Sequence, residues 1–382
     1  MSRRFEHALE ALDRRGRRRA LSPRAGVDFS SNDYLGLGAS PELREAMQAA
    51  LARGVAVGAG GSRLLRGNDP EHELLEAEAA THFGSEAALF FGGGFVANYA
   101  LYSTLPSRGD LIVYDSLIHA SALDGIRASK ADAVSCAHND AQAFDDAIVA
   151  WRASGATGRP WIAVESLYSM DGDCAPFADL TAVAARHDAM LMIDEAHATG
   201  VWGPDGRGLA AGLEGQTNVV SLHTCGKALG VSGALVLCTT DVRDYLVNRC
   251  RPFIYATAPS PLIAAGVRAA LALSASQPQR RERLQAMIAS AGRALESRCG
   301  VAASGTQIQP IVVGADARAT ALAAAMQSQG FDIRAVRPPT VPEGTARLRI
   351  SLTLNASESD VEHMIDALAR ELNLQHARTV SA

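Results

Sequence analysis

Lys227 is the first residue whose type and surroundings suggest chemistry, because few side chains here supply a primary amine. Lys130 and Lys227 are the two lysines among 36 basic residues, and the remaining 34 are arginine. Lys227 follows an apolar run and lies between Gly226 and Gly230. Glycines allow close approach of a ligand, and an amine held in one place suits a carbonyl cofactor. A lysine in a glycine-rich turn is also typical of an ordinary surface loop.

Asp194 is the second candidate, because it ends the apolar run that begins at Met190. A carboxylate there lies where α/β folds bind ligands, beyond the carboxyl ends of the strands. A protonated pyridine nitrogen would compensate its buried charge, and the ring would then withdraw electrons from a substrate carbanion. His197 follows three residues later and is able to reach a ring oxygen. Taken alone, Asp194 is equally a helix cap or a metal ligand, but Asp194 and Lys227 together favour pyridoxal phosphate.

A nucleotide hydrolase is the main competing interpretation of this segment, since Asp194–His197 reads D-E-A-H, as in helicase motif II. Such enzymes also need a P-loop. Around Lys227 that motif would require a glycine at the position of Ser221 and a hydroxyl at the position of Ala228. The P-loop is therefore excluded.

A phosphate group would be held where backbone amides converge. Gly92–Gly94 and Phe95 form a predicted turn between a strand and a helix, which is a ready anion site. The glycines are equally compatible with a plain tight turn. Thr224 adds a hydroxyl near Lys227, and His119 follows a predicted strand and is able to stack over a flat ring, although most lone histidines are structural.

The elements that position these residues alternate along the chain. Apolar runs at 87–91, 111–114, 161–165, 190–194 and 219–222 predict strands, and helical patterns separate them. This alternation predicts a mostly parallel sheet covered on both faces. The segment 233–238 follows Lys227 too closely for a crossover and is predicted to pair antiparallel. Ser40 and Asp69 are predicted to cap helices, the second of which ends at Gly84.

The C-terminal part has a different pattern, with predicted strands at 308–313, 331–336 and 347–352 and helices at 315–329 and 357–372. It predicts a smaller α+β domain. We therefore divide the chain into an N-terminal helix and arm (1–39), a large α/β domain (40–265) and a small domain (266–382).

Composition excludes several classes of protein. The 382 residues are 48% apolar and carry a net charge of −5, and no run of about 18 apolar residues occurs. Nucleic acid and membrane partners are not expected, and the protein is expected to be cytoplasmic. The six cysteines form no C-x-x-C pair or zinc-ligand pattern, so no metal site is expected.

Several motifs together resemble the fold-type I pyridoxal-phosphate enzymes and, within them, the α-oxoamine synthases. The resemblance covers nearly the whole chain. The motifs are Ser31–Gly36, His119–Ser121, Ser169–Asp173, Asp194-x-x-His197 with Thr199-Gly200, and Thr224-x-Gly226-Lys227. It implies a large, mostly parallel-sheet domain, a smaller C-terminal α+β domain and pyridoxal 5'-phosphate as the cofactor.

The resemblance also implies roles for individual residues. Lys227 would bind the cofactor covalently, Asp194 would pair with the pyridine nitrogen, His197 and Ser169 would hold the ring oxygen, and His119 would stack on the ring and act with Lys227 and Asp194 in catalysis. Further implied contacts are Gly94, Phe95 and Thr224 at the phosphate, Arg349 with Asn32 at the amino-acid carboxylate, Thr340 at the acyl substrate, and Arg19 or Arg18 as an N-terminal substrate arginine. A homodimer is implied, with residues near 254–257 facing the partner's cofactor.

Within the family the sequence is most similar to members that condense L-alanine with a pimeloyl thioester, either pimeloyl-CoA or a pimeloyl-acyl-carrier protein. The segments 137–140, 254–255 and 337–342 carry this similarity. The alternatives are family members that use glycine, such as 2-amino-3-ketobutyrate CoA ligase and 5-aminolevulinate synthase, and serine palmitoyltransferase. An aminotransferase and a non-catalytic pyridoxal-phosphate-binding regulator remain as alternatives of other classes.

Overall fold

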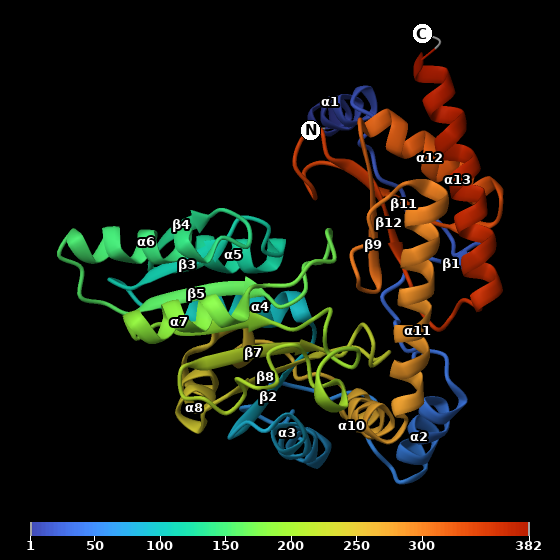
Figure 1. Cartoon of the computed structure of the whole chain (residues 1–382). Helices are drawn as coiled ribbons and strands as arrows, with labels where there is room; N and C mark the ends of the chain where they lie inside the picture. Colours follow the sequence, from blue (N-terminus) through green and yellow to red (C-terminus); the bar gives the residue numbers. More distant parts are fainter. Residues whose placement is uncertain (1, 381–382) are drawn as a thin grey trace. The chain divides into compact units, whose positions relative to one another are not determined.

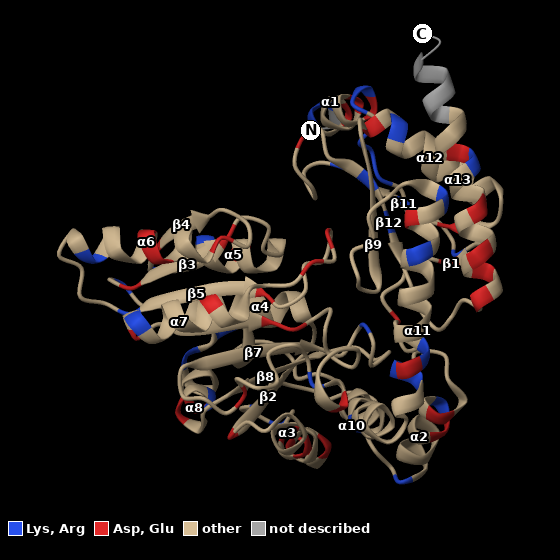
Figure 2. Cartoon of the chain, in the orientation of Figure 1, with Lys and Arg blue, Asp and Glu red and all other residues tan. Residues whose placement is uncertain are grey.

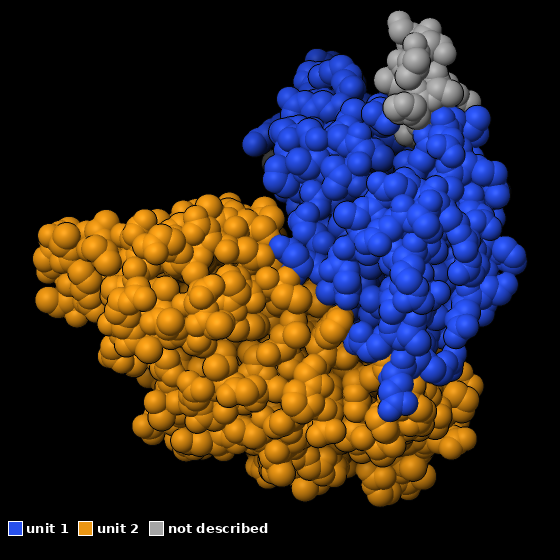
Figure 3. Space-filling model, viewed as in Figure 1, with its two compact units in different colours: residues 1–34, 170–173, 282–382 blue, residues 35–169, 174–281 orange. Residues whose placement is uncertain are grey.

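The computed structural model describes residues 2–380, which form two compact units. The first unit comprises residues 1–34, 170–173 and 282–382, of which 1 and 381–382 lie outside the described part, and the second comprises residues 35–169 and 174–281 (Figure 3). The chain thus leaves the second unit at residue 170 and returns to it at residue 174.

The second unit is built around a seven-stranded sheet with the order β2-β8-β7-β6-β5-β3-β4 (Figure 1). Only β8 runs antiparallel to its neighbours, so the prediction of a mostly parallel sheet with one antiparallel strand is confirmed. The strands are β2 (Ala87–Phe91), β3 (Leu111–Asp115), β4 (Asp132–Cys136), β5 (Pro160–Glu165), β6 (Met190–Asp194), β7 (Val219–Thr224) and β8 (Ala234–Cys238).

Helices cover both faces of this sheet, as the continuous apolar runs of its strands require. On one face Met190 and Met192 of β6 pack with α4 (Gly94–Thr104) and α5 (Ala120–Ala128). On the other, Leu191 and Ile193 pack with α6 (Ala141–Ala153) and α7 (Phe177–His187). The remaining helices of the unit are α2 (Pro41–Ala52), α3 (Pro70–Phe83), the short η1 (Pro204–Gly206), α8 (Thr240–Arg249), α9 (Arg251–Ile254) and α10 (Pro261–Ser276).

Helix ends follow the local signals of the sequence. The Ser40 side chain accepts a hydrogen bond from the Leu43 amide at the start of α2, and Asp69 accepts one from the Glu71 amide at the start of α3. Gly84 ends α3 with φ = 84°, a conformation that favours glycine. These predicted boundaries are confirmed.

The edge strand β4 was not predicted. Its residues are mostly exposed, with only Cys136 buried, and its sequence Asp132–Cys136 carries no continuous apolar run. Pairing with β3 alone defines it as a strand. An edge strand of this kind depends on main-chain hydrogen bonds, for which side-chain patterns give little signal.

The first unit contains a three-stranded antiparallel sheet, β11-β12-β9, and a two-stranded parallel pair, β1-β10. Its elements are α1 (Ser2–Arg14), β1 (Val27–Asp28), η2 (Leu295–Cys299), β9 (Ile308–Gly314), α12 (Asp316–Ser328), β10 (Phe331–Asp332), β11 (Arg334–Val336), β12 (Ala346–Ser351) and α13 (Glu358–Val380). Helix α11 (Pro278–Ala294) belongs to both units by residue number.

The prediction of one strand over 331–336 is wrong. The chain leaves one sheet for another at Ile333, because β10 pairs with β1 whereas β11 pairs with β12. Both short strands are extended, so the apolar pattern alone does not show the change of partner. Arginines at the end of α1 and in the arm that follows it form a basic stretch (Figure 2). Among residues 2–380, no helix is long and apolar enough to cross a membrane.

Candidate active site

A cavity of about 170 Å³ lies at the carboxyl ends of β5, β6 and β7 in the second unit. We call it the lysine cavity. It brings together seven of the predicted site residues, namely Gly94, Phe95, His119, Asp194, His197, Thr224 and Lys227. The other residues that line it are Asn98, Ser121, Glu165, Ala196 and Leu222. The position agrees with the general rule for ligand sites in parallel α/β sheets.

Lys227 presents its amine in this cavity, where Nζ lies 2.8 Å from Nε2 of the buried His197. The turn that follows the lysine depends on Gly230, which has φ = 67°. A Cβ atom at Gly230 would lie 2.3 Å from the Gly38 amide nitrogen, whereas one at Gly226 would lie 3.5 Å from its nearest neighbour. The backbone therefore requires glycine at position 230, whereas position 226 has room for a Cβ atom.

Asp194 is held by two donors. Its Oδ1 accepts a hydrogen bond of 2.8 Å from the Ala196 amide, and its Oδ2 accepts one of 2.6 Å from Nδ2 of Asn98. Asn98 lies on α4 and was not predicted as a site residue. The available signal was a polar residue within an apolar helix, directly after the glycine turn. These contacts hold the carboxylate in one orientation at the cavity, where a cationic group could pair with it.

His119 precedes α5 and caps it, because its Nδ1 accepts a hydrogen bond from the Ser121 amide at 3.2 Å. The same Nδ1 lies 2.7 Å from Oγ of Ser121, which itself accepts from Asn98 at 3.1 Å. Ser121 therefore donates to Nδ1, and this network assigns the imidazole proton to Nε2. Burial lowers the pKa of His119, and Lys227 lowers it further against the opposing effect of Asp194. The ring is thus neutral, with an apolar face suited to stacking.

The start of α4 supplies an anion site. No side chain caps this helix end, and a Cβ atom added at Gly92 or Gly93 would have no atom within 4 Å. A Cβ atom at Gly94 would instead lie 3.3 Å from Oγ1 of Thr224, so the hydroxyl stands directly against this turn. Backbone amides, a helix N-terminus and a hydroxyl are the donors that a phosphate group takes.

The lysine cavity thus has the donor set that pyridoxal phosphate requires. It combines an amine for the aldehyde, a held carboxylate for the pyridine nitrogen and an uncapped helix start with open space for the phosphate. Ser169, the other residue predicted at the ring oxygen, is buried and does not line the cavity itself. Its amide donates to Oε2 of Glu165, which does line it. Glu165 was missed, although it ends β5 as Asp194 ends β6.

The predicted substrate residues lie in the first unit and form two groups. In the first, Arg349 of β12 is buried, donates to Oγ of Ser351 at 2.7 Å and contacts Oη of Tyr34 at 3.4 Å. The Tyr34 hydroxyl in turn donates to Oδ1 of Asn32 at 3.0 Å. Asn32 and Arg349 are therefore linked through Tyr34.

The second group contains Arg19, whose guanidinium lies 3.3 Å from Oγ1 of Thr340. Both residues line a pocket of about 260 Å³, together with Arg17 and Arg337. Arg18 instead pairs with Asp13 at 2.7 Å and does not line this pocket. The structure thus groups Arg19, and not Arg18, with the predicted acyl-substrate residue.

The six cysteines in the described part of the chain are all free, and residues 2–380 hold no cluster of three or more His, Cys, Asp or Glu side chains arranged to bind a metal ion.

Comparison with known proteins agrees with this geometry. Residues 24–368 match the family Aminotransferase class I and II. The chain is similar to an 8-amino-7-oxononanoate synthase of Anaeromyxobacter dehalogenans, with 42% identity over 380 residues, or 95% of this chain and 94% of the relative.

Two solved structures are also similar. One is the 8-amino-7-oxononanoate synthase from Francisella tularensis, with 27% identity, a TM-score of 0.78 and coverage of 92% of this chain and 99% of that chain. The other is a high-resolution structure of SPT, a serine palmitoyltransferase, with PLP. It has 27% identity, a TM-score of 0.83 and coverage of 91% of this chain and 88% of that chain.

Proposed function

Because the chain belongs to the class I and II aminotransferase family, we propose that it is the pyridoxal-phosphate-dependent acyltransferase that joins L-alanine to a pimeloyl thioester. The reaction releases carbon dioxide and the free thiol carrier, and its product, 8-amino-7-oxononanoate, serves biotin biosynthesis. The single observation that carries the proposal is the cavity in which Lys227, Asp194 and the start of α4 converge. The names of the relatives support the choice of substrates.

The cofactor, when bound, supplies an electron sink that stabilises negative charge at the α-carbon of the amino acid. Asp194 would hold the pyridine nitrogen in its protonated form, and Asn98 and the Ala196 amide keep that carboxylate in place. His119, which lines the same cavity, would cover the ring and keep water from that face. Each contribution comes from a side chain that the fold already holds in position.

Lys227 would bind the cofactor through its aldehyde, and its Nζ is the group in this cavity that would serve as the base for the α-proton of the amino acid. His197 lies 2.8 Å from that nitrogen. A neutral imidazole at this distance accepts a hydrogen bond from the amine or donates one to it, depending on its tautomer. His197 therefore holds Nζ in position through a hydrogen bond.

The two groups in the first unit suit the two substrates. Arg349 offers a buried guanidinium for the carboxylate of L-alanine, a task for which the planar fork of arginine is suited. In the pocket of Arg17, Arg19, Arg337 and Thr340, Arg19 and Arg337 offer positive charge to an anionic acyl donor, whereas Arg17 is paired with Asp316 and Glu343. A pimeloyl chain carries a free carboxylate at its far end, which a palmitoyl chain lacks.

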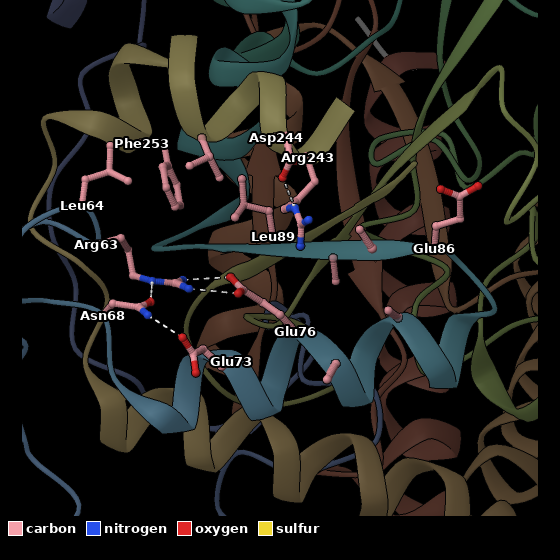
Figure 4. A pocket seen from close by; sticks show the side chains of 15 residues that line it. Arg63, Leu64, Asn68, Glu73, Glu76, Glu86, Leu89, Arg243, Asp244 and Phe253 are labelled. Atoms are coloured by element: carbon pink, nitrogen blue, oxygen red, sulfur yellow. Dashed lines mark hydrogen bonds and ion pairs between the residues drawn. The ribbon is translucent and has the colours of Figure 1, made fainter. Parts of the chain in front are cut away.

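A second copy of the chain is the proposed partner. Leu65 and Tyr255 are 85% and 71% exposed, and Tyr255 lies in the segment expected to face the partner's cofactor. Two residues before Leu65, Arg63 is fixed by two contacts to Glu76 of 2.8 and 2.9 Å and lies over the ring of Phe253 (Figure 4). The pocket around this pair has a volume of about 620 Å³. Large exposed apolar side chains such as Leu65 and Tyr255 support an interface at this part of the second unit.

The test is an absorbance spectrum of the purified protein before and after L-alanine and then pimeloyl-CoA are added, with mass spectrometry of the product. We expect a visible band that changes with L-alanine, followed by release of 8-amino-7-oxononanoate. A colourless protein that pyridoxal phosphate cannot restore would refute the proposal as a whole. A normal band with turnover only of glycine or serine would refute the choice of substrate.

A further inference from the structure

Glu165 ends β5 beside Asp194, and its side chain also lines the lysine cavity. The two residues are register partners in the parallel pair β5–β6. Partners of this kind place their side chains on the same face of a sheet. Glu165 is only 2% exposed, so two carboxyl groups lie next to each other in a buried site.

The two carboxyl groups have different hydrogen-bond partners. Asp194 has a donor at each oxygen, from Ala196 and from Asn98. Glu165 accepts a bond of 3.1 Å from the Ser169 amide at Oε2, but within the described part of the chain its Oε1 is buried without a hydrogen-bond partner. Buried polar atoms are nearly always paired in native proteins, so Oε1 points to a partner that enters the cavity.

The charges around Glu165 decide its protonation state. Burial raises the pKa of Glu165 well above its usual range, Asp194 raises it further, and Lys227 opposes both. Asp115, at the end of β3, also raises it. The titratable groups on the surrounding elements include Tyr102 of α4, Asp115 of β3, His119 before α5, Asp194 of β6, His197 after β6 and Lys227 after β7. Of two adjacent buried carboxyl groups, the one with fewer donors carries the proton.

We propose that Glu165 is a cofactor-positioning residue that acts as a neutral acid, with Oε2 fixing the Ser169 backbone and the proton on Oε1 donated to an acceptor of the bound pyridoxal phosphate. This inference rests on the proposed function. The two carboxyl groups then have different roles, since Asp194 carries the negative charge and Glu165 supplies an uncharged hydrogen-bond donor. Glutamine can replace such a donor, whereas alanine cannot.

The test compares Glu165→Gln and Glu165→Ala with the wild-type protein. Asp194→Asn is the matched control, because it removes the carboxylate that is proposed to be charged in the same cavity. The first readout is the dissociation constant for pyridoxal phosphate, measured on protein stripped of cofactor. We expect Glu165→Gln to stay within about threefold of wild type and Glu165→Ala to bind about tenfold more weakly. The second readout is the pH at which the visible absorbance of the cofactor on Lys227 changes. We expect Glu165→Gln to leave that pH unchanged and Asp194→Asn to lower it.

Two results would overturn the inference while leaving the proposed function intact. In one, Glu165→Gln lowers the pH of the absorbance change as much as Asp194→Asn does, which means that Glu165 is charged in the wild-type protein. In the other, Glu165→Ala binds the cofactor as tightly as wild type. A wild-type protein that binds no pyridoxal phosphate overturns both proposals. If Glu165→Gln does not fold, infrared spectra of wild type from about pH 6 to about pH 9 decide, because a neutral Glu165 requires a protonated carboxyl band throughout.

Discussion

At the scale of residues, the site depends on a few polar side chains held by each other inside an apolar sheet. Asn98 and Ser121 connect Asp194 to His119, so the group that would hold the pyridine nitrogen and the group that would cover the ring share one hydrogen-bond network. Lys227 is linked to His197 in the same cavity. The position of each group is therefore set before any cofactor binds.

Replacement of Lys227 by alanine tests the role of the amine. We expect the visible cofactor band to disappear and turnover to fall by at least about 100-fold, because both the covalent link and the base are lost. Absorbance spectroscopy and a product assay measure these effects, and circular dichroism should show an unchanged fold. Lys130→Ala is the matched control, since it removes the other lysine from an exposed position. An unchanged band in Lys227→Ala would transfer the assignment to Lys130.

His119 predicts a pH dependence of stability. Burial lowers its pKa in the folded state below the ordinary value of about 6.5. Between the two pKa values the unfolded chain binds more protons, so stability decreases as the pH falls from about 6.5 toward the folded-state value. His119→Asn keeps a capping side chain and removes the titration.

We therefore expect the melting temperature of cofactor-free His119→Asn to fall less than that of cofactor-free wild type as the pH is lowered over this range. His363→Asn is the control, because it removes an exposed histidine of α13 that does not line the lysine cavity. Parallel pH curves for His119→Asn and wild type would contradict the assignment of the effect to His119.

At the scale of elements, turns after the strands bring the site together. The turn after β7 carries Lys227 and closes at Gly230, whose positive φ and contact with Gly38 leave no room for a side chain. The turn after β2 opens α4 and leaves space for an anion. Both turns lie on the second unit, and both join a buried strand to a segment that lines the lysine cavity.

Gly230→Ala is expected to lower the free energy of unfolding by more than about 2 kcal/mol. Alanine is strained at a positive φ, and its Cβ atom would also clash with the backbone of Gly38. Gly226→Ala is its matched control, since the added Cβ atom would meet its nearest neighbour at 3.5 Å. Urea denaturation of both variants measures the difference. Equal stabilities would show that the turn rearranges without cost.

At the scale of the whole molecule, the exposed apolar side chains on the second unit predict self-association. We expect wild type to be a dimer by size-exclusion chromatography with light scattering. Leu65→Glu should give a monomer, because it places a charge where the interface excludes water. The matched control is Leu21→Glu, at a residue that is fully exposed in the first unit. A stable, active wild-type monomer would refute the proposed interface.

The sequence alone determined the residue types that are proposed to do chemistry and most of the elements that carry them. A rare lysine in a glycine-rich turn, an acid at the end of an apolar run and strands separated by helices are local patterns, and the strands at 87–91, 190–194 and 233–238 lie close to their predicted positions. Buried strands can be predicted from sequence because burial on both faces requires apolar side chains.

Only the tertiary structure decided which distant groups meet. The contacts of Asn98 with Asp194, the pairing of Glu165 beside Asp194 and the grouping of Arg19, but not Arg18, with Thr340 all join segments far apart in the chain. The same holds for β4 and for the change of sheet at Ile333, which depend on main-chain pairing. Such contacts follow from strand order and register, which a local pattern does not encode.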